Sequence, residues 1–192
     1  MIFSKHKIYS QIESSDYTKS KNNSALILDR DGVINIDHGY VGTIKDFFWN
    51  KEVFNLTKQY FDRGFLIFIA TNQSGIARGY YTEKDFLALT DWMVQEFIKR
   101  GIKITSVFWC PHHQEITGRC DCRKPNPKML LDIEAIFNIN LKTSYFIGDN
   151  DTDMEAGITA GIGNLFQLSM DSKNITNSRW SVINSLKDIH LQ

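Results

Sequence analysis

The chain has 192 residues, a length that fits one domain with a buried core and leaves little room for two. It carries 22 lysine and arginine residues against 22 aspartate and glutamate residues, so its net charge gives no reason to expect nucleic acid or an acidic membrane surface as a partner. The first residues lack the apolar core of a secretory signal, and no stretch approaches the roughly 18 apolar residues of a membrane span. We therefore expect a cytoplasmic protein with reduced cysteines that acts on a small molecule. A monomer is expected as well, although composition and charge do not decide this point.

The N-terminal segment differs in composition from the rest of the chain. Residues 1–24 are rich in serine, lysine and asparagine, which is typical of a poorly ordered extension. The first compact element is expected at 25–28, where an apolar run stops abruptly at charged residues and a glycine. The rest of the chain contains no internal repeat, so residues 25–192 are expected to form a single domain.

Short apolar runs with the length of buried strands recur along this domain. They lie at 25–28, 65–70, 106–110, 144–149 and 164–168. Segments with a helical spacing of apolar residues separate several of them. Strands that alternate with helices indicate a three-layer α/β fold, in which a mostly parallel, Rossmann-like sheet is covered on both faces.

Capping residues delimit the helices that are expected between these strands. The first helix ends before a glycine, after aromatic residues that share one face. Thr82 is a suitable N-cap for the second helix, with Asp85 three residues later, and Gly101 follows its end. In the third helix, Asn126 is expected as the N-cap and Pro127 in the first helical turn.

Polar side chains follow four of the predicted strands, at the point where each strand ends. Asp29 and Asp31 follow the first strand, Thr71 the second and Asp149 the fourth, while Lys124 closes the loop after the third. Because the carboxyl ends of parallel strands meet at one edge of a sheet, where α/β proteins bind ligands, these side chains are expected to converge. The sequence therefore predicts a site with three carboxylates, a hydroxyl group and a lysine.

This set of groups suits phosphoryl transfer. Carboxylates are the ligands that Mg²⁺ prefers, together with water and a substrate phosphate. A carboxylate can attack phosphorus when a metal ion and a cation such as Lys124 offset the repulsion between two anions. Asp31 can protonate the leaving group and later activate water, and Thr71 can bind a phosphoryl oxygen. Taken singly, an Asp-x-Asp before a glycine is also compatible with a simple turn.

All three cysteines of the chain lie within one short segment. Cys110-x-His112 and Cys120-x-Cys122 are equally spaced pairs that form a closed Cys₃His set, which suits structural, tetrahedral Zn²⁺. His113 is the alternative ligand, and the matching spacing of the two pairs favours His112. A local disulfide and three reduced cysteines without a metal are the other interpretations. A zinc module for nucleic acid would leave the acidic strand ends unexplained, and the chain lacks a basic stripe.

Together and in this order, the polar strand ends resemble the four motifs of the haloacid dehalogenase-like (HAD) superfamily, whose phosphatases form an aspartyl-phosphate. The resemblance implies that Asp29 is the nucleophile and Asp31 the general acid and base. It also implies that Thr71 is the second-motif hydroxyl and Lys124 the third-motif lysine. Mg²⁺ would then be held by Asp29, Asp149 and the main-chain carbonyl of Asp31.

Three further stretches resemble a capless branch of this superfamily that contains heptose bisphosphate phosphatases and histidinol-phosphate phosphatases. They are DHGY at 37–40, TNQSGIARG at 71–79 and CDCRKP at 120–125, the last within a cysteine loop like that of the zinc-containing members. The continuation SGIARG favours the heptose enzymes, because histidinol phosphatases typically carry an acidic residue after the glutamine. The resemblance therefore implies removal of the 7-phosphate of a manno-heptose 1,7-bisphosphate for a surface glycan such as lipopolysaccharide, with histidinol phosphate as the alternative substrate.

The same resemblance implies a set of substrate contacts. These residues are Asp37, His38, Gly39, Tyr40, Asn72, Gln73, Ser74 and Arg123. Asp153 would have an orienting role at the end of the fourth motif. Two positions depart from the family pattern, because Val33 replaces a common threonine and Asn150 replaces a lysine that is usual in the bacterial heptose enzymes. The second change removes a positive charge from the expected substrate site.

Overall fold

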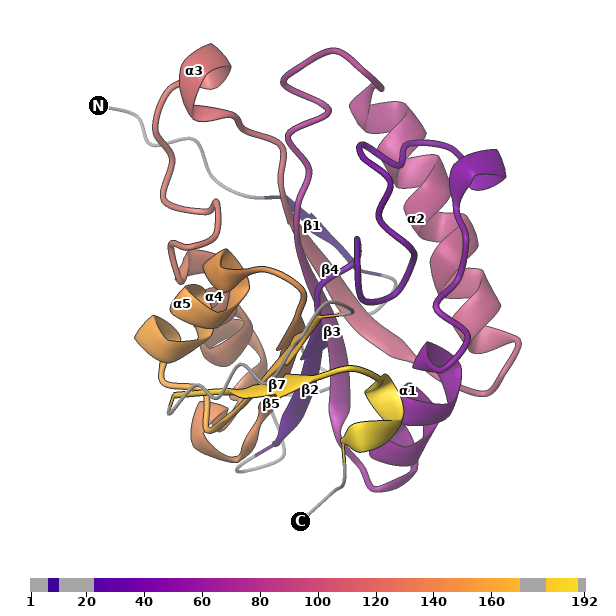
Figure 1. The fold of residues 1–192 in the computed structure, drawn as a ribbon, viewed down its shortest axis with the longest axis vertical. Helices are drawn as coiled ribbons and strands as arrows, with labels where there is room; N and C mark the ends of the chain where they lie inside the picture. The colour runs from indigo at the N-terminus through magenta and orange to yellow at the C-terminus, as the bar shows by residue number, and fades with distance from the viewer. Residues whose placement is uncertain (1–6, 11–22, 170–178, 190–192) are drawn as a thin grey trace.

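The computed structural model describes residues 7–10, 23–169 and 179–189, which form a layered α/β structure (Figure 1). A seven-stranded sheet runs through its centre in the order β1-β4-β3-β2-β5-β6-β7. The strand pairs from β4 to β7 are parallel, whereas β1 pairs with β4 in the antiparallel direction. The predicted α/β class with a mostly parallel sheet is confirmed.

Strands and helices alternate along most of the chain. The strands are β1 (Lys7–Tyr9), β2 (Ala25–Leu28), β3 (Leu66–Asn72), β4 (Ile104–Cys110), β5 (Tyr145–Gly148), β6 (Asn164–Leu168) and β7 (Ser181–Ile183). The α-helices are α1 (Val53–Asp62), α2 (Glu83–Ile98), α3 (Gln114–Thr117), α4 (Lys128–Phe137) and α5 (Asp151–Ala160), and short 3₁₀ turns lie at Ile44–Asp46, Leu141–Thr143 and Leu186–Asp188. Among the described helices, none has the length and apolar character needed to cross a membrane.

The central strands carry apolar residues on both faces, and each face packs against its own helices (Figure 1). Leu26 and Leu28 of β2 belong to the core cluster that includes residues of α1 and α2. Ala25 and Ile27, which point to the other face, belong to the cluster that includes residues of α4 and α5. Because successive side chains of a strand alternate between faces, four buried apolar residues in a row require a covering layer on each side.

The five strands expected from the apolar runs are all present, with ends shifted by one or two residues at most. The capping of α2 is also confirmed, because the Thr82 hydroxyl accepts a hydrogen bond from the Asp85 N–H and the Asp85 carboxylate accepts one from the Thr82 N–H. The expected start of α4 is wrong by one residue, since Pro127 is the N-cap. The Asn126 side chain instead donates a hydrogen bond to the Cys120 carbonyl, within the cysteine loop.

The structure adds elements that the apolar runs do not predict. Strand β1 lies inside the segment that was expected to be poorly ordered, and Lys7 stands opposite Trp109 of β4. Strand β7 pairs with β6, and helix α5 follows β5. The three-residue strands are too short for a recognisable pattern, so pairing with a longer neighbour defines them. Residues 1–6 and 11–22 of the expected extension lie outside the described residues.

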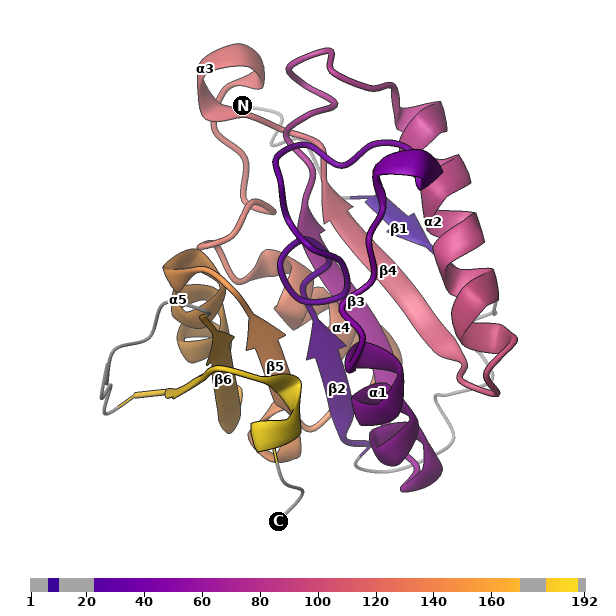
Figure 2. The same ribbon diagram turned by 45° about the vertical axis from the view of Figure 1, so that its right-hand side comes forward.

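The carboxyl ends of β2, β3, β4 and β5 point to the same edge of the sheet, the upper edge in Figure 2. The segments that follow these strands begin at residues 29, 73, 111 and 149 and gather at this edge. The polar strand ends singled out in the sequence therefore lie together, as parallel strands in one sheet require.

Candidate active site and metal centre

Three carboxylates meet at the carboxyl edge of the sheet. Asp29 follows β2, Asp149 follows β5, and Asp153 lies in the first turn of α5. One oxygen from each lies within 4.8 Å of the others, close enough to share a metal ion. The motif resemblance predicts Asp29 and Asp149 at this place but gives Asp153 only an orienting role.

Two glycines allow the carboxylates to approach the neighbouring backbone. Gly32 has a φ of +82°, and a Cβ at this position would collide with the Asp149 carboxylate. A Cβ on Gly148 would collide with the side chain of Asp153. These motif glycines are therefore needed for the packing of the acidic cluster as well as for the turns.

Lys124 is the cation of this cluster. Its ammonium nitrogen lies 3.0 Å from Asp29 Oδ1 and 2.6 Å from Asp153 Oδ1, and it donates to the Ala70 carbonyl at 2.7 Å. These three partners use all three N–H donors of the ammonium group. Burial alone would lower the pKa of Lys124, but the Asp153 and Asp29 carboxylates outweigh burial and raise it. The lysine is therefore held against the candidate nucleophile from inside the protein.

The charges in the acidic cluster do not balance. With all three carboxylates ionised, the single ammonium group would leave two net negative charges, because Asp31 is paired separately with Arg30. Burial, together with the Asp153 carboxylate, raises the pKa of Asp149 to about 6. Burial also raises the pKa of Asp29 above its usual range. Oxygen ligands with an excess of negative charge suit a divalent cation such as Mg²⁺.

The Asp31 carboxylate is held apart from the other three. Arg30 donates to its Oδ1 at 2.8 and 3.1 Å and to its Oδ2 at 2.8 Å. Asn35 donates to Oδ1 at 3.0 Å, and Gln73 donates to Oδ2 at 2.9 Å. Every partner that the described residues offer to this carboxylate is a hydrogen-bond donor. To act as an acid, Asp31 has to take up a proton and release one of these hydrogen bonds.

A cavity of about 500 Å³ opens between these groups and the surrounding loops. Its lining includes the predicted residues Asp29, Asp31, Asp37, Gly39, Tyr40, Thr71, Asn72, Gln73, Ser74, Arg123 and Asp149. Gly75, Tyr81, Asn150, Thr152 and Asp153 complete it. A cavity of this volume fits a small molecule.

Two predicted site residues do not line this cavity. Lys124 is buried behind the carboxylates, as described above. His38 is exposed, and its ring packs against the Phe48 ring with the centroids 5.8 Å apart. The substrate contact expected of His38 therefore stays a prediction that the cavity lining does not support. Its neighbours Asp37, Gly39 and Tyr40 do reach the cavity.

Asn72 holds the backbone of the cysteine loop. Its amide oxygen accepts from the Lys124 N–H, and its amide nitrogen donates to the Lys124 carbonyl, both at 3.1 Å. This pair of hydrogen bonds fixes Lys124 to the end of β3, where Thr71 also lies. The amide of Asn72 is therefore committed to a protein partner, although the residue borders the cavity.

Arg78 connects three of the loops around the cavity. Its guanidinium group donates to His113 Nε2 at 2.6 Å and lies over the Tyr40 ring at 5.8 Å from the ring centroid. Tyr40 in turn packs edge-on against Tyr80, with the centroids 4.5 Å apart. His113, the alternative zinc ligand, therefore pairs with Arg78. This pairing ties the cysteine loop to the loops that follow β2 and β3.

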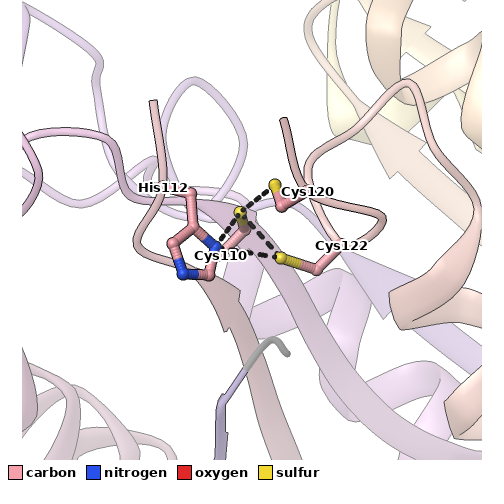
Figure 3. A group of neighbouring side chains, drawn as sticks. All are labelled: Cys110, His112, Cys120 and Cys122. Atoms are coloured by element: carbon pink, nitrogen blue, oxygen red, sulfur yellow. Dashed lines mark hydrogen bonds between the residues drawn. The ribbon is translucent and has the colours of Figure 1, made fainter. Parts of the chain in front are cut away.

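The three cysteines and His112 form a second cluster at the same edge (Figure 3). Cys110 Sγ lies 3.0 Å from Cys122 Sγ and 3.6 Å from Cys120 Sγ, and His112 Nδ1 lies 3.3 Å from Cys122 Sγ. All three cysteines are free, so the disulfide interpretation is wrong. With Zn–S bonds of about 2.3 Å, two ligands of a tetrahedral zinc ion lie about 3.7 Å apart. The donors and their spacing thus fit zinc.

The protonation of the thiols agrees with a metal site. The hydrogen bond from Cys122 lowers the pKa of Cys110, whereas the same hydrogen bond and burial raise the pKa of Cys122. Burial also raises the pKa of Cys120. Without a metal the cluster therefore accepts one negative charge readily and resists a second. A divalent cation would remove this conflict, because thiolates are the form that binds metal.

Some functional side chains carry little signal in the sequence. Arg30 separates the two aspartates of the first motif, and its pairing with Asp31 depends on the turn that follows β2. Asp153 lies in the first turn of α5, directly after the loop that carries Asp149, so its place beside Asp149 follows only once the start of this helix is known. Tyr81 has no such signal, because it reaches the cavity only through the packing of two loops.

The chain is similar to known proteins over most of its length. The HAD-hydrolase-like family model matches residues 121–169. A D-glycero-alpha-D-manno-heptose-1,7-bisphosphate 7-phosphatase of Campylobacter jejuni is 51% identical over 149 residues, which cover 78% of this chain and 84% of the relative. A D-glycero-beta-D-manno-heptose-1,7-bisphosphate 7-phosphatase of Escherichia coli is 40% identical over 179 residues, which cover 88% of this chain and 93% of the relative.

Solved structures agree with this similarity. The D,D-heptose 1,7-bisphosphate phosphatase from B. bronchiseptica, complexed with magnesium and phosphate, matches with a TM-score of 0.76 and 26% identity. The match covers 85% of this chain and 93% of that one. An HAD-like phosphatase from Mesorhizobium loti matches with a TM-score of 0.81 and 26% identity, over 92% of this chain and 85% of that one.

The parallel sheet with a carboxylate cluster at its carboxyl edge is the architecture of the HAD-like phosphatases, a class of phosphoric monoester hydrolases. The two sequence relatives extend the similarity well beyond the segment that the family model covers. The chain belongs to the family of the D-glycero-D-manno-heptose-1,7-bisphosphate 7-phosphatases. The resemblance seen in the motifs is confirmed.

Proposed function

We propose that this protein removes the 7-phosphate of D-glycero-D-manno-heptose 1,7-bisphosphate in a Mg²⁺-dependent reaction, during synthesis of a surface-glycan precursor such as that of lipopolysaccharide. The observation that carries the proposal is the similarity to two enzymes of this name over most of both chains. The acidic cluster and the adjoining cavity of about 500 Å³ supply a site of suitable chemistry and size. A cytoplasmic, monomeric enzyme is part of the proposal.

The acidic cluster would hold Mg²⁺. Asp29 and Asp149 would bind it through their side chains, and Asp31 through its main-chain carbonyl, as the motif resemblance implies. The two uncompensated negative charges of the cluster support this assignment. When bound, Mg²⁺ would neutralise charge on the transferring phosphoryl group.

Asp29 would be the nucleophile. Its Oδ1 pairs with the Lys124 ammonium group at 3.0 Å and accepts a hydrogen bond from the Arg30 backbone N–H at 2.7 Å. Its Oδ2 has no hydrogen bond from the residues that the structure describes, so this oxygen is available to attack phosphorus. The attack forms an aspartyl-phosphate as the bond to the sugar oxygen breaks, and water then hydrolyses this acyl phosphate, which releases inorganic phosphate and restores the carboxylate.

Asp31 and Thr71 would assist the two steps. Asp31 would give a proton to the departing sugar oxygen and take one from the attacking water. The Thr71 hydroxyl, at the end of β3, would donate a hydrogen bond to a phosphoryl oxygen. Lys124, held between Asp29 and Asp153, would keep the nucleophile oriented and offset part of the negative charge.

The Cys₃His cluster would bind structural Zn²⁺ through Cys110, His112, Cys120 and Cys122. Four protein donors leave no position for a substrate, which is typical of a structural site. Arg123 and Lys124 follow the last donor directly, so the metal would fix the backbone from which both side chains extend. In this proposal Arg123 contacts the second phosphate or the sugar hydroxyls.

The proposal is tested by steady-state kinetics with both anomers of the heptose bisphosphate, because the names of the two relatives differ in the anomer. Histidinol phosphate and an aryl phosphate complete the panel. We expect Mg²⁺-dependent release of one phosphate per heptose bisphosphate, with the highest kcat/KM for one of its anomers. A higher kcat/KM for histidinol phosphate would favour the alternative substrate, and no Mg²⁺-dependent turnover of any ester would overturn the proposal.

A further inference from the structure

Gln73 lines the cavity, but its amide is bound entirely to protein groups. The side chain is buried, and its Nε2 donates to Asp31 Oδ2 and to Thr71 Oγ1, both at 2.9 Å. Its Oε1 accepts from the Tyr81 hydroxyl at 2.6 Å. Both N–H donors of the amide are therefore used, so Gln73 has no free donor for the direct sugar contact that the motif resemblance implies.

The Tyr81 hydroxyl fixes the direction in which the amide faces. An amide oxygen only accepts and an amide nitrogen only donates, so the two ends of Gln73 are not interchangeable. With Oε1 bound to Tyr81, the nitrogen faces Asp31 and Thr71. The reverse orientation would place the amide oxygen against the ionised Asp31 carboxylate, where two acceptors repel.

Two loops hold the ring of Tyr81 in place. A Cβ on Gly42 or on Gly75 would collide with this side chain, so the backbone lies against it at both places. Gly42 belongs to the segment after β2, and Gly75 to the segment after β3. Burial raises the pKa of Tyr81 to about 12, so the hydroxyl keeps its proton and donates at neutral pH. The donor that orients Gln73 is thus itself rigid.

Gln73 joins two groups that have different tasks in the proposed reaction. Because Thr71 Oγ1 accepts from Gln73, the hydroxyl proton is directed away from the amide and stays available for a phosphoryl oxygen. Because Asp31 Oδ2 accepts from the same nitrogen, its distance from Thr71 is fixed as well. One amide therefore sets both the direction of a donor and the place of a carboxylate.

We propose that Gln73, oriented by Tyr81, is a positioning residue that holds the Thr71 hydroxyl and the Asp31 carboxylate in the arrangement needed for phosphoryl transfer. This inference rests on the proposed function, because it acts through Thr71 and Asp31. Neither Gln73 nor Tyr81 touches the reacting atoms in it. Their loss should therefore lower kcat and leave KM nearly unchanged, since the groups they place act mainly in the transition state.

The first test is the Tyr81→Phe variant, which keeps the ring between the two glycines and removes only the hydroxyl. We expect kcat for the heptose bisphosphate to fall about tenfold, as expected for one lost hydrogen bond, with KM within about twofold of wild type. Tyr60→Phe is the matched control, because the Tyr60 hydroxyl is also buried but has no hydrogen-bond partner among the described residues. This control should keep the wild-type kcat.

The second test is a double-mutant cycle with Gln73→Met, which keeps the length of the side chain and removes the amide. We expect a loss in kcat of about 100-fold, and we expect Tyr81→Phe to add nothing to it, because the hydroxyl acts only through the amide. Losses that multiply, or a rise in KM with kcat unchanged, would overturn the inference. Thermal melting of each variant separates a loss of catalysis from a loss of folding.

The two proposals fail in different ways. If wild-type protein hydrolyses no phosphate ester with Mg²⁺, the proposed function is wrong. If wild type is active and Tyr81→Phe keeps the wild-type kcat, only the positioning role of Gln73 and Tyr81 is wrong. Should Gln73→Met not fold, the comparison of Tyr81→Phe with Tyr60→Phe still decides the role of the hydroxyl.

Discussion

The acidic cluster and the Cys₃His cluster lie at the same edge of the sheet but are built in opposite ways. Asp29 and Asp149 directly follow central strands, and Asp153 lies in the first turn of a ten-residue helix. In the Cys₃His cluster only Cys110 belongs to a strand, and the other three donors lie in the connection between β4 and α4. The sheet therefore places the carboxylates, whereas three of the four Cys₃His donors depend on the course of a loop.

The two clusters meet at Lys124. This residue lies two positions after Cys122, and its ammonium group pairs with Asp29 and Asp153. The acidic cluster depends on the cysteine loop for Lys124. The four donors of the Cys₃His cluster include no residue of the acidic cluster, so the reverse dependence is absent. Damage to the carboxylates should leave the cysteine loop intact, and damage to the loop should impair the acidic site.

The largest effect is expected from Asp29→Asn, which breaks only the acidic cluster. An amide does not attack phosphorus and binds Mg²⁺ more weakly, so kcat should fall by at least about 10⁴-fold. The zinc content and the thermal midpoint should stay close to those of wild type. Steady-state kinetics and metal analysis of Asp62→Asn, which changes an exposed carboxylate of α1, provide the control. Activity near wild type in a pure Asp29→Asn preparation would remove Asp29 as the nucleophile.

The second-largest effect is expected from His112→Asn, which removes one donor from the Cys₃His cluster. The variant should lose zinc, fall in stability by about 3 kcal/mol or about 10 °C, and lose about 100-fold in activity because Lys124 is no longer held in place. The control is His113→Asn, since His113 contacts Arg78 and lies outside the Cys₃His cluster. This control should keep one zinc per chain. Zinc loss in His113→Asn but not in His112→Asn would reverse the assignment of the ligand.

Arg123→Ala changes a residue that belongs to both regions, because Arg123 follows the last cysteine yet lines the acidic cavity. Loss of a charged, bidentate donor should raise KM for the bisphosphate about 30-fold and KM for a monophosphate less than about threefold. Zinc content should not change. Arg119→Ala is the control, because Arg119 is exposed on the same loop and does not line this cavity. Equal rises in KM for both esters would contradict a contact with the second phosphate.

The smallest effect concerns the pH dependence of the acidic cluster. In the metal-free protein the pKa of Asp149 is raised to about 6 from an ordinary value of 3.8, so the folded chain binds a proton that the unfolded chain has released. The contribution of Asp149 to metal-free stability should therefore fall as the pH rises from about 4 to about 6. Mg²⁺ competes with the proton on Asp149. The rise in the thermal midpoint that Mg²⁺ causes should therefore be about 3 °C greater at pH 8 than at pH 5. Thermal melts with and without Mg²⁺ measure this difference, and Asp149→Asn should abolish it.

Much of the fold could be predicted because its signals are local. The apolar run at 25–28 shows a buried strand, and Thr82 with Asp85 shows a helix start, since neighbouring residues decide both. The three cysteines with His112 were predicted from their spacing, and the structure brings them together. Strand β1 was not predicted, because three residues acquire their conformation only by pairing with β4.

The alternation of strands and helices, the polar residues at the strand ends and the four candidate metal donors could all be predicted from local sequence. These features depend on residues close together in the chain, where spacing and chemistry are sufficient. The tertiary structure decided that Asp153 joins Asp29 and Asp149, while the Asp31 side chain pairs with Arg30. The strand order β4-β3-β2-β5 and the packing of the loops bring these distant groups into contact, and local sequence encodes neither.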